Sequence, residues 1–290
     1  MLKEEIDSLA PGRDFSRRGF VQTAVGTVGG GFAAAVLPVT AQTISTDTAG
    51  LEAGSVSMPV GDFKLPAYRA APAGRKNLPV ILVASEIFGV HEHIADVCRR
   101  FAKLGYLAIA PELFVRHGNA GAYTDIPKLI SEVVSKASDA QVNADLDAAV
   151  AWAAANGGDT SKLGITGFCW GGRTTWTYAA HNTKLTAGVA WYGPVARSYH
   201  PGDKTAVERA TSIKAPVLGL YGAADSGIPV ETLTQLEAAL KAAGHTKSEF
   251  VVYPDTPHAF HADYRPSYRK AAADDGWARC LAWFRKHGVA

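Results

Sequence analysis

A cysteine set between glycines is the feature of this chain with the clearest chemical meaning. Residues 167–172 read GFCWGG, with a short β-prone run before them and a segment able to continue as a helix after them. This pattern is typical of a tight strand-to-helix turn that carries a nucleophile, because glycines two positions to either side of Cys169 leave room for the turn. A helix that starts just after Cys169 would aim unpaired N–H groups at the sulfur and favour the thiolate. Covalent catalysis by Cys169 is therefore favoured over the alternative, a buried core cysteine followed by a Gly-Gly turn.

Two later loops carry the partners that such a nucleophile needs. Asp225 follows the apolar run at 217–221, and His258 follows the run at 248–253. If both runs are parallel strands, their carboxyl ends bring Cys169, Asp225 and His258 to one edge of the sheet. His258 would then take the thiol proton, while Asp225 would orient the imidazole and stabilise its charged form.

The elements that must position these residues alternate between strand-like and helix-like segments, a pattern typical of an α/β domain with a mostly parallel sheet. An antiparallel pair at 55–60 and 63–71 opens the domain, turned at Gly61 and Asp62. Residues 79–85 (PVILVAS) form the continuous apolar run of a central strand buried on both faces. Further strands are expected at 106–110, 161–166, 187–191, 217–221 and 248–253, and helices at 93–104, between 126 and 156, and at 173–182, 230–243 and 268–287.

The first forty residues belong to a different class of sequence. Arg17 and Arg18 form a twin-arginine signature, a Gly/Ala-rich apolar stretch follows, and Val39-Thr40-Ala41 resembles a cleavage site. We predict a twin-arginine signal peptide at 1–41, a short linker at 42–54 and one catalytic domain at 55–290. The mature protein would be periplasmic or secreted, and its precursor would use the twin-arginine export machinery. The apolar stretch is too short and too glycine-rich to predict a stable membrane span.

Composition narrows the remaining classes. The 290 residues carry a formal net charge of +2, and the basic residues are scattered, so nothing indicates nucleic-acid binding. Three cysteines leave at least one unpaired, and Cys98 and Cys280 fall in helical patterns where we expect packing roles. His91-Glu92-His93 is interpreted as a polar helix start, because the second histidine of a zinc-protease motif would stand where Ala95 is; no metal site is predicted.

The motifs together resemble the dienelactone hydrolase family over essentially the whole predicted domain. The resemblance rests on residues 85–89 (SEIFG), 167–172 (GFCWGG), 222–229 (GAADSGIP) and 257–260 (PHAF). It implies an α/β-hydrolase fold without a large lid and cofactor-free hydrolysis of a cyclic enol-lactone by a Cys-His-Asp triad. It also implies that Glu86 contacts the thiol in the resting enzyme and swings away when substrate binds.

Oxyanion stabilisation and substrate binding complete the predicted site. Backbone N–H groups of Ile87 and Trp170 are expected to face the developing oxyanion, whatever their side chains. The family binds its substrate's carboxylate with arginines, and the resemblance implies that Arg116 is one of them. The second arginine falls shortly after the catalytic histidine, where this chain has none until Arg265.

Three functions stay open at this point. The first is a hydrolase of a small ester or lactone that works through a thioacyl-enzyme. The second is a broad carboxylesterase or thioesterase on the same scaffold, which the missing arginine and the export signal both favour. The third is a non-catalytic binding protein on the same fold, and the intact Cys169, Asp225 and His258 argue against it.

Overall fold

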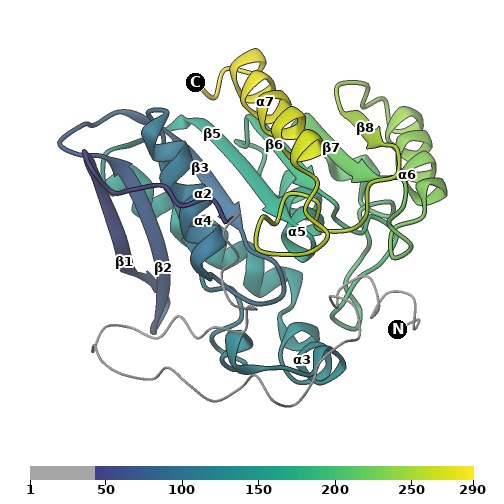
Figure 1. Cartoon of the computed structure of the whole chain (residues 1–290), viewed down its shortest axis with the longest axis horizontal. Coiled ribbons are helices and arrows are strands. Elements are labelled where there is room, and N and C mark those ends of the chain that lie inside the picture. Colours follow the sequence, from purple (N-terminus) through teal and green to yellow (C-terminus); the bar gives the residue numbers. More distant parts are fainter. Residues whose placement is uncertain (1–42) are drawn as a thin grey trace.

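An eight-stranded sheet forms the centre of the structure, a computed structural model that describes residues 43–290 (Figure 1). The strand order is β1-β2-β4-β3-β5-β6-β7-β8. β1 pairs antiparallel with β2, and β2 antiparallel with β4, whereas all other neighbours pair in parallel. The predicted mostly parallel sheet is therefore confirmed. The strands are β1 (Leu51–Val60), β2 (Phe63–Pro72), β3 (Leu78–Ala84), β4 (Leu107–Pro111), β5 (Gly158–Phe168), β6 (Ala187–Trp191), β7 (Val217–Gly222) and β8 (Glu249–Tyr253).

Helices cover both faces of this sheet, as the α/β pattern predicts. α2 and α7 lie on one face, and α4 and α5 lie on the other (Figure 1). The helices are α2 (Glu92–Lys103), α3 (Ile126–Glu132), α4 (Asp139–Ala155), α5 (Trp170–His181), α6 (Val230–Ala242) and α7 (Lys270–Lys286), with short 3-10 turns η1 (Ala120–Ala122), η2 (Val134–Lys136) and η3 (Ala210–Ser212). None of the helices within residues 43–290 is both long enough and apolar enough to span a membrane.

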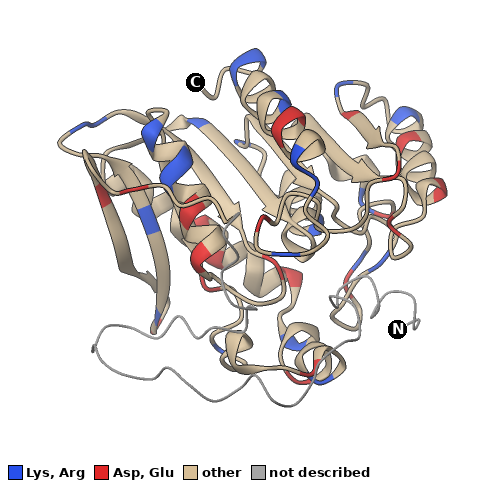
Figure 2. Ribbon diagram, viewed as in Figure 1, with Lys and Arg blue, Asp and Glu red and all other residues tan. Residues whose placement is uncertain are grey.

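The central strands form because their residues are apolar and many are β-branched. β3, β4, β6 and β7 contain no charged residue, and in Figure 2 the charged positions lie on helices, loops, outer strands and the start of β5 instead. Strands buried on both faces by helices read as continuous apolar runs, which is why the sequence pattern located them. Their carboxyl ends meet at one edge, and that edge positions the site.

The amino-terminal part of the domain differs from the prediction. β1 begins at Leu51 rather than at residue 55, because β2 continues to Pro72 and offers a pairing partner for every added residue. The preceding segment is not a free linker. The Thr46 N–H donates to Asp96 Oδ1 at 2.5 Å, and Arg99 Nε donates to the Thr46 carbonyl at 2.7 Å, so this segment is bound to α2. The predicted signal peptide lies outside the described residues.

Candidate active site

Cys169 sits at the turn between β5 and α5, in the tight geometry that the sequence predicts. Its backbone has φ 55° and ψ −117°, values that a residue with a side chain rarely adopts. A Cβ at Gly167 would lie 2.0 Å from the Gly171 carbonyl oxygen, and one at Gly171 would lie 2.2 Å from the Ala84 carbonyl oxygen. Both positions therefore require glycine if the turn is to close. Cys169 thereby stands at the amino-terminal end of α5, where the first N–H groups of a helix have no intrahelical partner.

The loops after β7 and β8 bring the predicted acid and base into contact. His258 Nδ1 and Asp225 Oδ2 are 2.6 Å apart, and both side chains are buried. Asp225 also accepts the Gly227 N–H at 3.0 Å, which fixes the carboxylate. The two loops touch through their backbones, since the Ala224 N–H donates to the Thr256 carbonyl at 3.1 Å. This backbone contact fixes how far apart the two loops lie, whatever side chains they carry.

The electrostatics of His258 favour its protonated form. Burial lowers the pKa of the imidazole, but the charges of Asp225 and Cys169, and hydrogen bonding to both, outweigh burial and raise the pKa to about 10. Nε2 is buried and has no hydrogen bond of good geometry in the described chain. Because Nδ1 is committed to Asp225, Nε2 is the nitrogen left to exchange a proton with the sulfur.

Aromatic residues after β6 pack around this imidazole. The Tyr192 ring meets the His258 ring edge to face, with centroids 5.2 Å apart. Tyr192 has φ 38°, and a Cβ on the following Gly193 would lie 2.2 Å from the Gly172 carbonyl carbon, so the chain here is pressed against the start of α5. The sequence left this segment open between pocket lining and core packing. The structure buries Trp191 and Tyr192 completely while placing Tyr192 against His258.

Glu86 has different partners from the one that the family resemblance implies. Its Oε2 accepts the Tyr264 hydroxyl at 2.5 Å and faces His91 Nε2 at 3.2 Å, while Arg265 Nη2 lies 4.0 Å from Oε1. Neither oxygen is hydrogen-bonded to Cys169, and the contact with the thiol that the resemblance implies stays a prediction. Burial alone would raise the pKa of Glu86, but Arg265 and His91 overcome it and hold the pKa well below its usual value. Glu86 is therefore a carboxylate.

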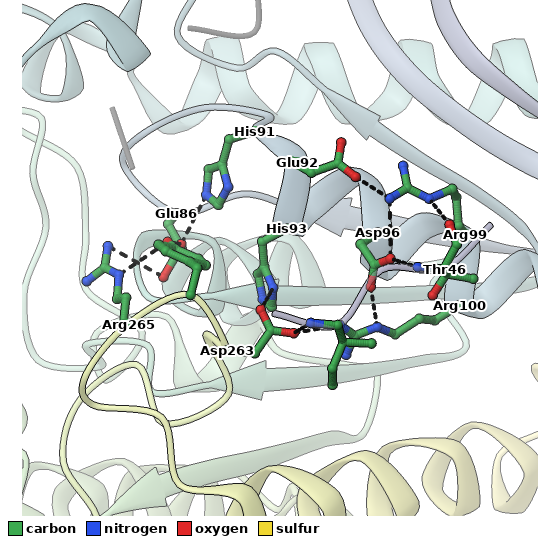
Figure 3. A network of polar contacts seen from close by, with 12 residues as sticks. Thr46, Glu86, His91, Glu92, His93, Asp96, Arg99, Arg100, Asp263 and Arg265 are labelled. Carbon is green, nitrogen blue, oxygen red and sulfur yellow. Dashed lines mark hydrogen bonds and ion pairs between the residues drawn. The ribbon is translucent and has the colours of Figure 1, made fainter. Parts of the chain in front are cut away.

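A second polar cluster, centred on Asp263, lies near Glu86 and its partners (Figure 3). His93 Nδ1 lies 3.1 Å from Asp263 Oδ1, and Arg100 Nη2 donates to Asp263 Oδ2 at 3.0 Å. The Ile44 N–H also donates to Asp263, at 3.1 Å. Asp263 directly precedes Tyr264, so α2 and the segment at Ile44 together hold the loop that carries Tyr264 and Arg265, two partners of Glu86.

Sequence reasoning missed Tyr264 and His91 as site residues, and it treated Arg265 as a departure from the family pattern. The structure buries the Arg265 guanidinium beside Glu86, with Nε donating to the Tyr264 hydroxyl at 3.2 Å. The signal in the sequence was weak but present: a Tyr-Arg pair follows His258 within seven residues. His91 and His93 bind carboxylates of the fold, and no group of three or more metal-binding side chains is found in residues 43–290.

Arg116, the predicted carboxylate anchor, is engaged elsewhere. Its Nη1 donates to the buried Asp145 at 2.5 Å, and its guanidinium lies 4.2 Å from the centre of the Phe63 ring. These contacts orient the loop after β4. A role in substrate binding stays a prediction.

The other two cysteines pack as the sequence predicts. Cys98 in α2 and Cys280 in α7 are unpaired and fully buried, and burial raises the pKa of both thiols far above the usual range. Neither lies at a helix amino terminus. Cys169 is therefore the cysteine whose surroundings suit a reactive thiol.

Fold and site together define a class of protein. A mostly parallel sheet covered by helices, with a tight strand-to-helix turn at Cys169 after β5 and with Asp225 and His258 in loops after later strands, is the architecture of the α/β-hydrolases. The model of the dienelactone hydrolase family matches residues 65–288. The chain therefore belongs to the dienelactone hydrolase family and is a hydrolase of the ester and lactone class.

Similar proteins extend over almost the whole chain. A protein of Methylorubrum extorquens named "Putative carboxymethylenebutenolidase" is 58% identical over 289 residues, covering 99% of this chain and 98% of its own length. A protein of the same name from Escherichia coli (strain K12) is 51% identical over 265 residues, covering 89% of this chain and 96% of its own. The crystal structure titled "Putative Dienelactone Hydrolase" from Klebsiella pneumoniae is 54% identical, with a TM-score of 0.79, and covers 81% of this chain and 98% of that one.

Proposed function

We propose that the protein hydrolyses a small ester or lactone through a thioacyl-enzyme formed on Cys169. The single observation that carries this proposal is the 2.6 Å contact between His258 and Asp225 beside a cysteine held in a strained turn. His258 takes the thiol proton on Nε2, and the raised pKa of the imidazole keeps that proton there while the sulfur is negative. Asp225 orients the ring through Nδ1.

The thiolate then attacks the ester carbonyl. The C–S bond forms as the carbonyl π electrons move to oxygen, and the N–H groups of Ile87 and Trp170 stabilise the resulting oxyanion. Trp170 opens α5, where the first N–H groups have no intrahelical partner, and Ile87 follows the end of β3. Collapse of the oxyanion breaks the C–O bond, and His258 gives its proton to the leaving oxygen. Water, deprotonated by His258, releases the acid and restores the thiol.

Glu86 is proposed to act as a fixed negative charge in this cycle. Because Tyr264, His91 and Arg265 already hold it, the carboxylate does not compete with His258 for the thiol proton in this arrangement. A move of Glu86 toward the sulfur would require breaking these contacts.

A broad carboxylesterase or thioesterase is the second candidate, and Arg116 favours it. The predicted carboxylate anchor is paired with Asp145, so a substrate without a carboxylate loses nothing at that position. A non-catalytic binding protein on this fold is the third.

Turnover of a panel of lactones and p-nitrophenyl esters, with Cys169→Ala as control, separates these candidates. We expect Cys169→Ala to lose at least about a thousandfold in kcat while its thermal unfolding is unchanged, since only the thiolate forms the acyl-enzyme. Cys169→Ser should lose roughly a hundredfold or more, because serine is a weaker acid. Near-normal kcat in Cys169→Ala would refute the covalent mechanism, and an inactive wild type across the panel would favour a binding protein.

We also propose that residues 1–41 direct export by the twin-arginine route, so that the enzyme works in the periplasm or outside the cell. Arg17 and Arg18 before an apolar stretch support this proposal. A reporter fused to residues 1–45 should reach the periplasm, and replacing both arginines by lysine should retain it in the cytoplasm. Equal export of the Lys-Lys form would refute the route.

A further inference from the structure

A cavity of about 530 Å³ opens between the loop after β3 and the loop after β4. Its size is that of a small-molecule pocket. Two of its walls reach the catalytic residues: the Phe114 ring packs on the ring of Trp170, with centroids 4.6 Å apart, and His91 lies 3.2 Å from Glu86. Cys169 does not itself line the cavity, but these contacts make the cavity a neighbour of the site, and the inference below takes a substituent of the substrate as its occupant.

The wall of the cavity is mostly apolar and carries one acidic group. Phe88, Val90 and Phe114 supply much of the apolar surface. Glu112 is the carboxylic acid, and its Oε2 accepts the Val90 N–H at 3.2 Å. Burial raises the pKa of Glu112 to about 7, and the Val90 N–H is the group that opposes this rise. No lysine or arginine lines the cavity in the described part of the chain.

The second ionisable group of the wall is also an acceptor. Because Glu86 is a carboxylate, His91 must donate to it through Nε2, which leaves Nδ1 as an acceptor. Burial lowers the pKa of His91, so the ring stays neutral at pH 7 and above. Glu112 and His91 together offer acceptors to a ligand and no positive charge.

The two arginines near the cavity are held by other carboxylates. Arg116 pairs with Asp145, and Arg265, which packs 5.0 Å from the centre of the Phe88 ring, lies beside Glu86. Neither lines the cavity. A ligand carboxylate placed in the cavity would therefore face Glu112 without a cation to compensate.

We propose that Glu112 determines substrate specificity: the cavity accepts an apolar substituent that ends in a hydrogen-bond donor, above all an ammonium group, and excludes one that ends in a carboxylate. The inference rests on the proposed function of Cys169, because it assigns the occupant of the cavity to the substrate. A donor meets the carboxylate in a charge-assisted hydrogen bond, whereas an anion meets like charge in a sheltered site.

Binding to the inactive Cys169→Ala protein tests the proposal without turnover. Pentylammonium and pentanoate have the same apolar chain and opposite charge, and calorimetry at pH 8 measures their dissociation constants. We expect pentylammonium to bind at least about tenfold more tightly. Adding Glu112→Gln should bring the two constants within about threefold, because glutamine still accepts the Val90 N–H but carries no charge. Glu231→Gln, on the exposed start of α6, is the matched control and should change neither.

Three outcomes would overturn the proposal. They are equal affinities in the Cys169→Ala protein, a preference that survives Glu112→Gln, and no measurable binding of either ligand at millimolar concentration. The pH dependence adds a check on mechanism. Glu112 and His91 are the titratable groups facing the cavity. Because the pKa of Glu112 is raised to about 7 while burial lowers that of His91, the preference for the ammonium should grow between pH 6 and pH 8 as Glu112 ionises.

Turnover distinguishes this inference from the proposed function. Three p-nitrophenyl esters, whose acyl chains end in an ammonium, a primary amide or a carboxylate, are compared in the protein with native Cys169. Glu112→Gln should lower kcat/KM for the first by about tenfold, leave the second unchanged and raise the third by about tenfold. Hydrolysis of all three esters by Cys169→Ala would refute the covalent mechanism. The calorimetric comparison of pentylammonium and pentanoate would still test the binding preference on its own.

Discussion

Two glutamates follow neighbouring parallel strands, yet they differ in charge. Glu86 follows β3 and Glu112 follows β4, and His91 contacts the first and shares a cavity with the second. Burial raises the pKa in both cases. At Glu86, Arg265 and His91 reverse the effect and keep the group ionised, whereas Glu112 has only the Val90 N–H and its pKa rises to about 7. Partners, rather than depth, decide which carboxyl is charged.

This difference gives two regions at one edge of the sheet different electrostatic properties. The region around Glu86 is closed by Tyr264, Arg265 and the Asp263 cluster, so its charge is permanent and its geometry is fixed. The region around Glu112 faces a cavity, so its charge depends on pH and on what binds. Pairs of titratable groups with opposed shifts are typical of catalytic sites.

Removing the positive charge of Arg265, beside Glu86, should have the largest effect on the free energy of unfolding. Arg265→Met leaves Glu86 buried without its main charge partner, and we expect the free energy of unfolding in urea to fall by about 3–5 kcal/mol at pH 7. Because the pKa of Glu86 is depressed, the stability from ionisation is present above its unfolded pKa of 4.5 and disappears as pH falls. The penalty of Arg265→Met should therefore shrink below pH 4.5.

Two variants control for loss of packing at this position. Arg265→Lys keeps a charge and should recover part of the loss, and Arg269→Met removes an exposed arginine four residues later and should cost little. A penalty for Arg265→Met that is the same at pH 3 and pH 7 would mean that Arg265 contributes packing alone.

Substitution of Arg116 tests whether Asp145, a third buried carboxylate, also depends on an arginine partner for stability, as Glu86 does. Arg116→Ala removes the partner of the buried Asp145, and we expect a loss of about 1–2 kcal/mol, less than at Arg265 because the Arg116 side chain is 21% exposed. KM should change equally for an acidic lactone and a neutral ester of similar size. A selective rise of tenfold or more for the acidic lactone would instead establish Arg116 as the substrate anchor.

Glu112 should make stability depend on pH in the opposite direction from Glu86. Its pKa rises from 4.5 to about 7 on folding, so the native state holds the proton more tightly, and stability falls as pH rises between these values. Glu112→Gln should remove this dependence and raise stability at pH 8 by about 1–2 kcal/mol relative to the wild type, with no gain at pH 4. Thermal unfolding at both pH values measures the effect; equal shifts at both would exclude ionisation as the cause.

The sequence predicted what depends on local pattern. The glycines around Cys169 and the placement of Asp225 and His258 after apolar runs located the three residues, since parallel strands deliver such loops to one edge. The alternation of apolar runs and helices likewise predicted nearly every element. Each of these features depends on residues close together in the sequence, so it can be recognised in a single sequence.

Long-range partners were beyond such reasoning. Tyr264 meets Glu86 across 178 residues of sequence, and His93 meets Asp263 across 170. No periodicity links these residues, so the arrangement of Glu86 differed from the expectation. Arg116 was assigned to substrate because its motif matched, but the buried Asp145 that pairs with it lies 29 residues later on α4, and no local pattern links the two.

The smallest expected effect concerns the hydroxyl that Glu86 accepts. Tyr264→Phe removes one hydrogen bond from Glu86 and keeps the ring, so we expect a loss of about 1 kcal/mol in unfolding free energy. His91 and Arg265 remain, and the carboxylate should stay ionised at pH 7. If Glu86 is only a fixed charge, kcat should fall by less than about fivefold and the pH profile of kcat/KM should keep its shape. A new ionisation near neutral pH in that profile would show that Glu86, once released, exchanges a proton with the Cys169 thiol, and would restore the movable role that the family resemblance implied.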